Sequence, residues 1–427
     1  MHKSLNLGNN KSKINIETQI SSDDIIKQLG NNPTICFEVT EKCNLNCRYC
    51  AYGEFYDGYN PRDGSDLAVE MGKKVVDQIV SSFNLRVGDN RCVHISFYGG
   101  EPLLRFDFIK QIVDHCSNYR KENILFSYSM TTNGVLLNRY QNFLKENNFN
   151  LLISLDGNEI NNSFRNFKNG KPSFNLVYNN ANELKNKYPD YFNNYVSFNS
   201  VLHKKNNVSD TVTYIYKNFG IVPGINYVSY DGVRKDKINE FKKTFDNDDY
   251  VPLKREKCDK GMYLNYELET PEFQEAIYLI RNLTNHFYTS YIDLLTYSIK
   301  TRLHTATCIP FMKKVFITSK GVILPCENVP HVNNLGKTSC NGLEIDFGQI
   351  ADNFSKDLTK MLQTCRNCYN LYSCDMCLFQ RKNADGSFDF SCFHTKKKME
   401  KKFTEIFTYL EQNDNAFQRI INEISLL

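Results

Sequence analysis

Short segments rich in β-branched and aromatic residues recur between residues 34 and 230, separated by longer segments with apolar residues at helical spacing. The expected strands are 34–40, 92–98, 126–132, 151–156, 196–202 and 225–230. The expected helices between them are 68–83, 106–119, 137–147, 174–187 and 209–218. Repeated strand–helix units imply parallel strands with helices outside, and about six units are too few for a closed eight-fold barrel. The sequence therefore predicts an α/β fold with an open, partial (βα)6 barrel.

Residues able to do chemistry stand at the ends of three expected strands. A cysteine triplet follows the first strand, and a Gly-Gly-Glu-Pro turn at 99–102 follows the second. Asp156 and Gly157 stand at the end of the fourth. Function in βα barrels collects at the C-terminal ends of the strands, which meet at one rim. We expect these groups to share that rim.

The fifteen cysteines of the chain fall mainly into two groups. Three lie between Cys43 and Cys50, and seven more lie between Cys308 and Cys392. The N-terminal residues have no apolar core of a secretory signal, and no segment approaches the ~18 apolar residues of a membrane span, so we expect a cytoplasmic protein. In a reducing compartment clustered cysteines are more often metal ligands than disulfides. The net charge of +4 gives no argument for a nucleic acid or a membrane as partner.

Cys43, Cys47 and Cys50 have the spacing C-x3-C-x2-C directly after a strand. Three thiolates on a [4Fe–4S] cluster leave one iron free, as catalytic zinc sites keep one open position. A free iron can bind the amino and carboxylate groups of S-adenosylmethionine (SAM). The alternatives are a zinc site or three unrelated core cysteines. The nearby aromatic Tyr49 and the glycine-rich turn at 99–102 favour the cluster.

With these motifs, residues 34–230 resemble the catalytic domain of the radical SAM superfamily. The positions that the resemblance assigns to SAM binding are Tyr49, Gly99, Gly100, Glu101, Pro102, Ser154 and Arg165. Tyr49 would lie beside the adenine, and the glycine-rich turn would receive the methionine amino group. Ser154 and Arg165 would contact the carboxylate or the ribose; otherwise they are an ordinary strand serine and a surface arginine.

The second cysteine group resembles the SPASM extension of radical SAM proteins, which carries up to two auxiliary [4Fe–4S] clusters. A hairpin turning at Gly321 is expected between Cys308 and Cys326. If the family pattern holds, one cluster takes Cys365, Cys368, Cys374 and Cys392. The other takes Cys308, Cys326 and Cys377, with Cys340 or a substrate thiolate as its fourth ligand. This chain departs from the family pattern at its last pair, Cys374 and Cys377. The spacing is C-x2-C here, whereas the family more often has C-x3-C. A pair of zinc sites is the alternative.

The expected division of the chain follows from these motifs. It runs 1–32 as an N-terminal arm, 33–231 as the barrel, 232–305 as a bridge, 306–394 as the auxiliary iron–sulfur domain and 395–427 as a C-terminal helix. Residues 271–286 are the clearest helix of the bridge. In the last stretch, Phe403, Ile406, Phe407 and Leu410 recur at helical spacing.

SPASM-bearing radical SAM enzymes mostly modify ribosomally made peptides, and this chain is most similar to bacterial peptide maturases whose targets carry cysteine repeats. The resemblance implies an oxidoreductase that forms a thioether or carbon–carbon crosslink in a precursor peptide, with no catalytic base identified. It also implies an electron donor such as a flavodoxin or ferredoxin. The alternatives are an anaerobic sulfatase-maturating enzyme, which makes formylglycine, and a non-catalytic iron–sulfur protein that binds peptides.

Overall fold

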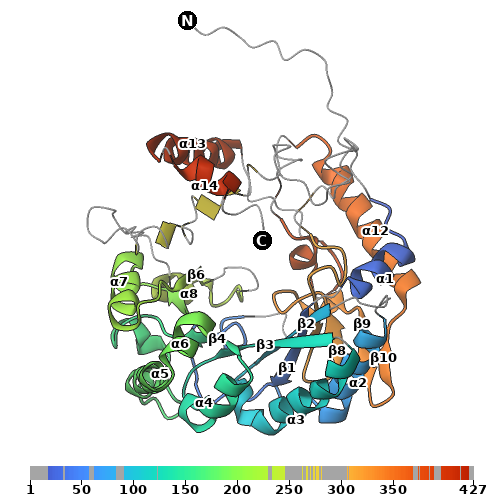
Figure 1. Ribbon diagram of the computed structural model, residues 1–427. Helices are drawn as coiled ribbons and strands as arrows, with labels where there is room; N and C mark the ends of the chain where they lie inside the picture. The colour runs from blue at the N-terminus through green and yellow to red at the C-terminus, as the bar shows by residue number, and fades with distance from the viewer. Residues whose placement is uncertain are drawn as a thin grey trace, which may run out of the picture.

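The computed structural model describes residues 18–31, 34–56, 62–82, 91–122, 124–228, 233–245, 307–368, 376–383, 385–388, 396–413 and 415–422, with single positions in 262–280 and at 305 and 374. Within these residues a ten-stranded sheet has the order β10-β9-β8-β7-β1-β2-β3-β4-β5-β6 (Figure 1). Expectations for residues 1–17, for Cys392 and for most of the bridge lie outside the described residues.

Six parallel strands form the barrel and confirm the predicted fold class. They are β1 (Thr34–Thr40), β2 (Arg91–Gly99), β3 (Ile124–Thr132), β4 (Asn150–Ser154), β5 (Val196–Leu202) and β6 (Gly224–Tyr227). The helices that cover them are α2 (Val69–Ser81), α3 (Phe106–Cys116), α4 (Leu137–Glu146), α5 (Phe174–Lys187), α6 (Pro189–Tyr195) and α7 (Val208–Phe219). Short 3-10 turns lie at Pro102–Arg105 (η1), Ser117–Glu122 (η2) and Asn161–Phe164 (η3). Of these helices, α6 was not expected from the sequence.

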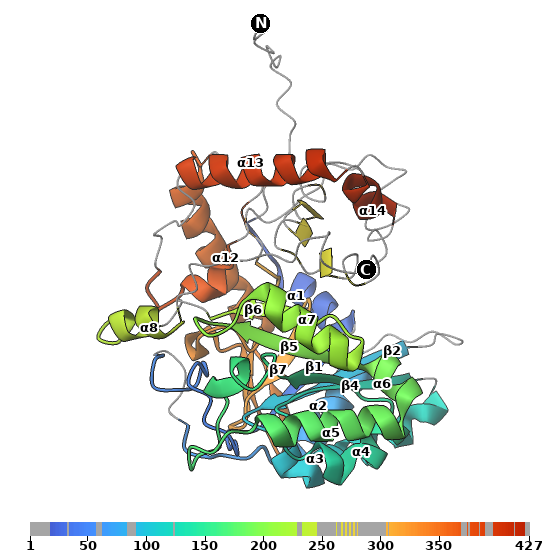
Figure 2. The ribbon, with the colours of Figure 1, turned by 90° about the vertical axis from the view of Figure 1, so that its left-hand side faces the viewer.

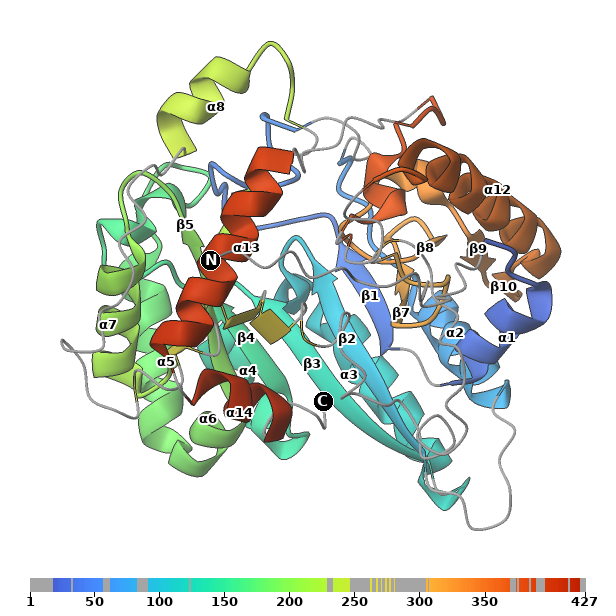
Figure 3. The same cartoon turned by 90° about the horizontal axis from the view of Figure 1, so that it is seen from above.

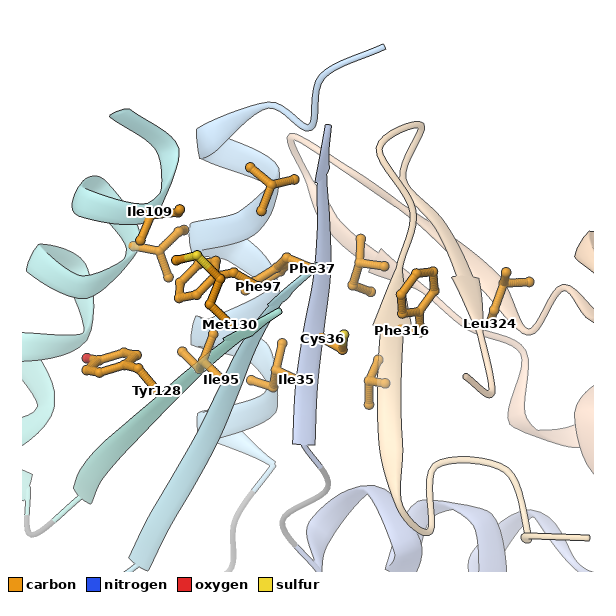
Figure 4. Packing of buried hydrophobic residues seen from close by; sticks show 14 of the residues in the cluster. Ile35, Cys36, Phe37, Ile95, Phe97, Ile109, Tyr128, Met130, Phe316 and Leu324 are labelled. Carbon is orange, nitrogen blue, oxygen red and sulfur yellow. The ribbon is translucent and has the colours of Figure 1, made fainter. Parts of the chain in front are cut away.

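Successive side chains of each strand point to opposite faces of this sheet. On β2, Val93, Ile95 and Phe97 are fully buried, and Phe97 packs edge-on against Phe108 of α3 (Figure 4). Cys92, His94, Ser96 and Tyr98 alternate with them and remain partly exposed on the opposite, concave face. The helices therefore cover one face, and partly exposed side chains line the other.

The cysteine-rich C-terminal region continues the same sheet, which the sequence did not predict. Its strands are β7 (Lys314–Ile317), β8 (Val322–Leu324), β9 (Gly336–Ser339) and β10 (Gly342–Glu344). β7 pairs in parallel with β1, from Thr34 opposite Lys314 to Phe37 opposite Ile317, and the later strands are antiparallel. The expected hairpin at Gly321 is confirmed, since Gly321 has φ +77.

The N-terminal segment holds a helix where only a polar arm was expected. α1 (Ser22–Gly30) begins with a capping box between Ser21 and Asp24, and it packs against α12 (Phe347–Cys365), as Figure 3 shows. The Ile20 amide donates to Ser355 Oγ on α12 at 2.9 Å. Two further 3-10 turns lie near this region, η5 (His331–Asn333) and η6 (Leu378–Arg381).

The C-terminal helices pack on a core of their own. α8 (Ile238–Phe245), α13 (Lys396–Gln412) and α14 (Ala416–Asn422) complete the helices whose bounds the structure gives. α13 and α14 lie on the side of the sheet opposite α2–α5 (Figures 1 and 2). Ile406 and Ile420 bury against Phe273 and Ile277 of the bridge. Of the apolar residues that recur at helical spacing in α13, Ile406 is buried and Phe407 is 54% exposed. In the described part of the chain, no helix is both long and apolar enough to cross a membrane.

Candidate active site at the strand ends

The loop after β1 brings Cys43, Cys47 and Cys50 together. All three thiols are partly exposed, and each lies close enough to the other two to interact electrostatically. The Cys50 amide donates to the Cys47 carbonyl at 3.1 Å, which turns the loop back on itself.

A second segment pins this loop. The Asn46 amide donates to the Asn166 carbonyl at 2.8 Å, and the Arg48 amide donates to the Phe164 carbonyl at 3.0 Å. These bonds join the cysteine loop to residues 164–167 as a short antiparallel pairing. The pairing therefore carries Arg165 to the same place as the cysteines.

The donor set fits an iron–sulfur cluster. Burial raises the pKa of Cys43 and raises that of Cys47 to about 12, so both thiols stay protonated when no cation is near. A bound iron would supply the positive charge that deprotonates them. The Leu45 amide donates to Cys43 Sγ at 3.4 Å, as donors around cluster sulfurs commonly do. Among the described side chains, no three His, Cys, Asp or Glu form a site for a single metal ion.

The glycine-rich turn closes directly against the cysteine loop. The Gly100 amide donates to the Thr40 carbonyl at 2.8 Å, and the Glu101 amide donates to the Lys42 carbonyl at 2.9 Å. A Cβ on Gly100 would lie 2.2 Å from the Lys42 oxygen, and Gly99 has φ +126. Glycine is needed at both positions because the two backbones touch there.

Glu101 joins this turn to the end of β3. Its fully buried carboxylate accepts hydrogen bonds from the Leu103 amide (3.1 Å), Thr132 Oγ1 (2.8 Å) and the Asn133 amide (2.8 Å). Burial raises the pKa of Glu101, and these donors oppose that shift. Pro102 is buried at the start of η1. The contact of this turn with a methionine amino group stays a prediction.

Tyr49 and Arg165, both expected at the SAM site, lie beside the carboxylate of Asp156. The Tyr49 hydroxyl donates to Asp156 Oδ2, and Arg165 Nη1 donates to the Tyr49 hydroxyl at 2.8 Å. Arg165 Nη1 lies 3.9 Å from Asp156 Oδ1. Arg165 is only 8% exposed, so it is not a surface arginine. Burial raises the pKa of Asp156, and the Arg165 guanidinium lowers it again.

His203 completes the rim at the end of β5. It is fully buried, its ring stacks on Tyr49 with centroids 6.1 Å apart, and its Nε2 lies 2.9 Å from the Asn161 carbonyl oxygen. Burial lowers the pKa of His203 to about 4, so the ring is neutral. Ser154 lies on the concave face of β4, opposite Asn199 of β5, and is 7% exposed.

The concave face below this rim is polar and largely uncharged. Strand register places Ser96, Ser129 and Asn150 in one row. His94 lies between two serines, with Nδ1 2.8 Å from Ser127 Oγ and Nε2 2.8 Å from Ser129 Oγ. Hydroxyl and amide groups of this kind can hydrogen-bond the backbone of a bound peptide.

In the second cysteine group, Cys308, Cys326 and Cys377 converge. The Cys377 thiol interacts electrostatically with both others, and burial raises the pKa of Cys326 to about 11. Cys340 is exposed in the turn between β9 and β10. Cys377 thus lies near the other two cysteines that the prediction assigns to the same auxiliary cluster, whereas nothing described places Cys340 beside them.

The other expected ligands are placed only in part. Cys365 ends α12, and the Cys368 amide donates to its carbonyl at 2.8 Å. Cys374 is described as a single position, and Cys392 lies outside the described residues. No disulfide joins any of the cysteines that the structure describes. The ligand roles in this second group remain predictions.

Sequence reasoning placed Asp156 on the rim without a role, and it did not assign Asn133 and His203 to the site. Asn133 Nδ2 lies 2.7 Å from Asn44 Oδ1 and 3.7 Å from Cys43 Sγ, beside the cysteine loop. Asn133 and His203 directly follow the parallel strands β3 and β5. That position was the signal that could have found them.

Comparison with known proteins gives one family match. Residues 37–215 match the family model of the radical SAM superfamily. The chain is 39% identical over 129 residues to an uncharacterized protein of Methanocaldococcus jannaschii, covering 30% of this chain and 40% of that protein. It is 31% identical over 129 residues to a radical SAM cyclopropyl synthase of Paramaledivibacter caminithermalis, covering 28% and 26%. It is 37% identical over 121 residues to a cysteine-type anaerobic sulfatase-maturating enzyme of Clostridium novyi, covering 28% and 30%. The matches span well under half of each relative.

Solved structures resemble nearly the whole chain in fold. One is anSMEcpe with bound AdoMet and Cp18Cys peptide, with a TM-score of 0.56 and 19% identity, covering 92% of this chain and 99% of that one. Another, with AdoMet and Kp18Cys peptide, has a TM-score of 0.57 and 18% identity, with the same coverage. At this identity the likeness establishes the fold alone.

Proposed function

We propose, from the premise that residues 37–215 are a radical SAM domain, that this chain is an enzyme that modifies a ribosomally made peptide. In this proposal Cys43, Cys47 and Cys50 hold a [4Fe–4S] cluster and the strand-end rim binds SAM. When bound, the cluster supplies one electron that cleaves SAM to a 5′-deoxyadenosyl radical, which takes a hydrogen atom from the peptide.

The residues of the rim connect the loops of this site and exclude water from it. Glu101 ties the glycine-rich turn to β3, and the turn in turn fixes the cysteine loop. Tyr49 is held between Asp156 and Arg165, all three buried, so that this part of the rim excludes water.

The observation that supports a peptide crosslink is that one residue of the concave face, Tyr98, lies near both cysteine groups. Tyr98 interacts electrostatically with Cys50 of the first group and with Glu327, which follows Cys326 of the second. Glu327 is paired with Lys314 at 2.8 Å, and Lys314 interacts with both Cys36 on β1 and Cys326. A peptide on this face would lie between the two groups.

This arrangement suits a two-site oxidation of the peptide. Forming a thioether from a C–H and an S–H removes two hydrogens. One leaves as the hydrogen atom taken by the deoxyadenosyl radical. The other leaves as a proton, and its electron needs an acceptor. Cys308, Cys326 and Cys377 would hold the auxiliary cluster, which would supply an electron acceptor there.

Product mass tests the proposal. The anaerobically reconstituted protein is incubated with SAM, a reductant and a cysteine-containing candidate precursor peptide. We expect 5′-deoxyadenosine together with a peptide lighter by two hydrogens per crosslink, located by fragmentation. A protein with the cysteine loop intact that makes no 5′-deoxyadenosine would refute the proposal.

The second candidate is formylglycine formation on a sulfatase-type substrate. It is favoured by the 37% identity over 121 residues to the cysteine-type anaerobic sulfatase-maturating enzyme of Clostridium novyi. The same incubation separates the two, because formylglycine formation converts one cysteine to an aldehyde with loss of its sulfur. A crosslink keeps the sulfur and joins two residues.

A further inference from the structure

Ser129, His94 and Ser127 form a hydrogen-bonded row on the concave face, and the proposal above gives this row no part in proton transfer. His94 Nε2 lies 2.8 Å from Ser129 Oγ, and His94 Nδ1 lies 2.8 Å from Ser127 Oγ. All three side chains are partly exposed. Both nitrogens of one ring are thus engaged by hydroxyl groups, each of which can accept one proton while it donates another.

One end of the row lies on the part of the face that is proposed to bind the peptide. Strand register places Ser129 of β3 opposite Ser96 of β2 and Asn150 of β4. Ser129 is three residues from the end of β3, or about 10 Å at the rise of a strand. A side chain that reaches down from the strand-end rim therefore meets the row at this hydroxyl group.

The other end of the row lies near solvent. Within the described strands, β1 pairs with β2 from Ile95 onward and β4 pairs with β3 from Ser129 onward, so the sheet narrows towards Ser127. The thiol of Cys92 lies 3.7 Å from Ser127 Oγ and is exposed, and Leu125 on the same face is 58% exposed. The row therefore connects the middle of the concave face with its solvent-exposed edge.

His94 has the protonation state that a proton acceptor needs. Burial lowers its pKa below the ordinary 6.5, and the charge of Lys314 on β7 lowers it further, so the ring is neutral at pH 7. Lys314 itself holds Glu327 in an ion pair at 2.8 Å. Burial raises the pKa of Cys36, on the neighbouring β1, to about 12, so that thiol stays protonated.

We propose that Ser129, His94 and Ser127 relay the proton of the substrate's cysteine thiol to solvent. The inference rests on the proposed function, because crosslinking releases that proton. The thiol S–H bond breaks and its proton passes to Ser129 Oγ, while the Ser129 hydroxyl proton moves to His94 Nε2. The hydrogen on His94 Nδ1 passes to Ser127, whose own hydroxyl proton enters water.

The remaining atoms and electrons of the step are already accounted for. The substrate C–H hydrogen goes to the deoxyadenosyl radical, a C–S bond replaces the S–H bond, and one electron goes to the acceptor of the proposed function. The thiol also loses its proton when a cysteine is oxidised towards formylglycine. The relay therefore serves either candidate reaction.

The test compares His94→Gln with His115→Gln in the reconstituted holoenzyme, supplied with SAM, a reductant and the cysteine-containing peptide. Glutamine keeps hydrogen-bonding groups at residue 94 but does not titrate. His115 lies on α3, paired with Asp77 of α2, so its replacement is the same chemical change away from the concave face. 5′-Deoxyadenosine and modified peptide are quantified separately between about pH 5.5 and 8.

We expect His94→Gln to form about 100-fold less modified peptide per 5′-deoxyadenosine, as for a lost proton acceptor, while continued 5′-deoxyadenosine formation shows that it is folded. In wild type this ratio should fall as the pH drops through the pKa of His94, because a protonated ring accepts nothing; in the variant it should not depend on pH. His115→Gln should match wild type. Ser129→Ala should share the loss, and Ser129→Thr, which keeps the hydroxyl group, should restore the ratio. A His94 variant with the wild-type ratio and pH profile would overturn the relay.

Histidine-ring NMR of the oxidised holoenzyme gives a readout apart from turnover. The signal that is missing in His94→Gln should report a neutral ring at about pH 7.5, and a ring protonated there would also overturn the relay. A wild-type protein that makes no 5′-deoxyadenosine would refute the proposed function and the relay with it. Normal wild-type turnover with an unaffected His94 variant would refute the relay alone.

Discussion

Glu101 illustrates how a single buried side chain can fix two loops of the rim. Its two carboxylate oxygens accept from different backbone amides, those of Leu103 in its own turn and Asn133 after β3. Because Glu101 is fully buried, no water can replace a lost partner. The cysteine loop depends on this arrangement through the Lys42 carbonyl, which accepts from the Glu101 amide.

We predict that Glu101→Gln destabilises the protein by about 2 kcal/mol. Whichever oxygen the amide group replaces, the new N–H₂ faces a backbone N–H, of Leu103 or of Asn133. Urea denaturation followed by circular dichroism measures the loss. Glu183→Gln is the matched control, since Glu183 accepts only from side-chain amides of Asn138 and Gln141, which can reorient. A Glu101 variant as stable as this control would contradict the prediction.

His203 should make stability depend on pH. Its folded pKa, about 4, lies below the ordinary value of 6.5, so the unfolded chain binds the proton first as the pH falls. The stabilisation is complete above pH 6.5 and is lost towards pH 4, with about 2 kcal/mol lost by pH 5. His203→Gln keeps a donor for the Asn161 carbonyl but cannot titrate. Its unfolding free energy should fall less steeply than that of wild type between pH 7 and 5, with equal slopes from pH 7 to 8.

Residue roles could be predicted where the chemistry is carried by a local motif. The three cysteines, the glycine-rich turn and the pair Tyr49 and Arg165 were placed at one site by the sequence, and the structure brings them together. Asp156 was expected on the rim but without a role, and His203 was not recognised, because the role of each arises only from contact with Tyr49, which is distant in the chain. A buried ion pair has no periodicity that a sequence can display.

At the scale of elements, contact between backbones explains the geometry of the rim better than helix or strand propensity does. The glycine-rich turn touches the cysteine loop with no room for a side chain at residue 100. Its position after β2, next to the loop after β1, follows from the pairing of these strands, where Thr40 lies opposite Gly99. A substitution that moves this turn therefore also moves the cysteine loop of the proposed cluster site.

We predict that Gly100→Ala displaces the cysteine loop, because the new Cβ would lie 2.2 Å from the Lys42 oxygen. The cost should be about 3 kcal/mol, at the upper end for an overpacked site, and iron binding should fall with it. Hydrogen exchange of residues 43–50 and iron content measure the two effects. Gly220→Ala is the control: Gly220 has φ +76 with no atom within 4 Å of its Cβ position, so it should cost only about 1 kcal/mol and leave iron binding intact.

The elements themselves were predictable where periodicity is local. Five of the six barrel strands lie within two residues of their expected bounds, and β6 ends three residues before its expected bound. Their β-branched and aromatic content is visible along the chain. α1 was missed although Ser21 and Asp24 have the spacing of a capping box. The pairing of β7 with β1 could not be read from the sequence, since it joins residues nearly 280 positions apart.

At the scale of the whole molecule, this pairing makes the cysteine-rich region part of the barrel. β7 covers the edge of β1 that β2 leaves open, and the sheet continues through β8 to β10. Figure 4 shows Phe316 on β7, next to β1, and Leu324 on β8 beyond it, and both belong to the same buried cluster as the barrel residues. The strands of the cysteine-rich region and those of the barrel therefore share one sheet and one core, as the proposed oxidation of a peptide at two sites would need.

We predict that a chain ending at residue 305 does not fold into a stable barrel. It exposes an edge of β1 and loses the side chains of Val315, Ile317, Ile323 and Leu324, each at most 1% exposed. At about 2 kcal/mol each, their burial approaches the ~5–15 kcal/mol by which a domain is stable. A chain ending at residue 394 is the control, since α13 and α14 pack on a separate cluster with Phe273. Calorimetry should find a cooperative transition for the control and aggregation for the shorter chain. A soluble, cooperatively unfolding fragment 1–305 would show that the barrel is complete without β7, and that the two cysteine groups sit on separable domains.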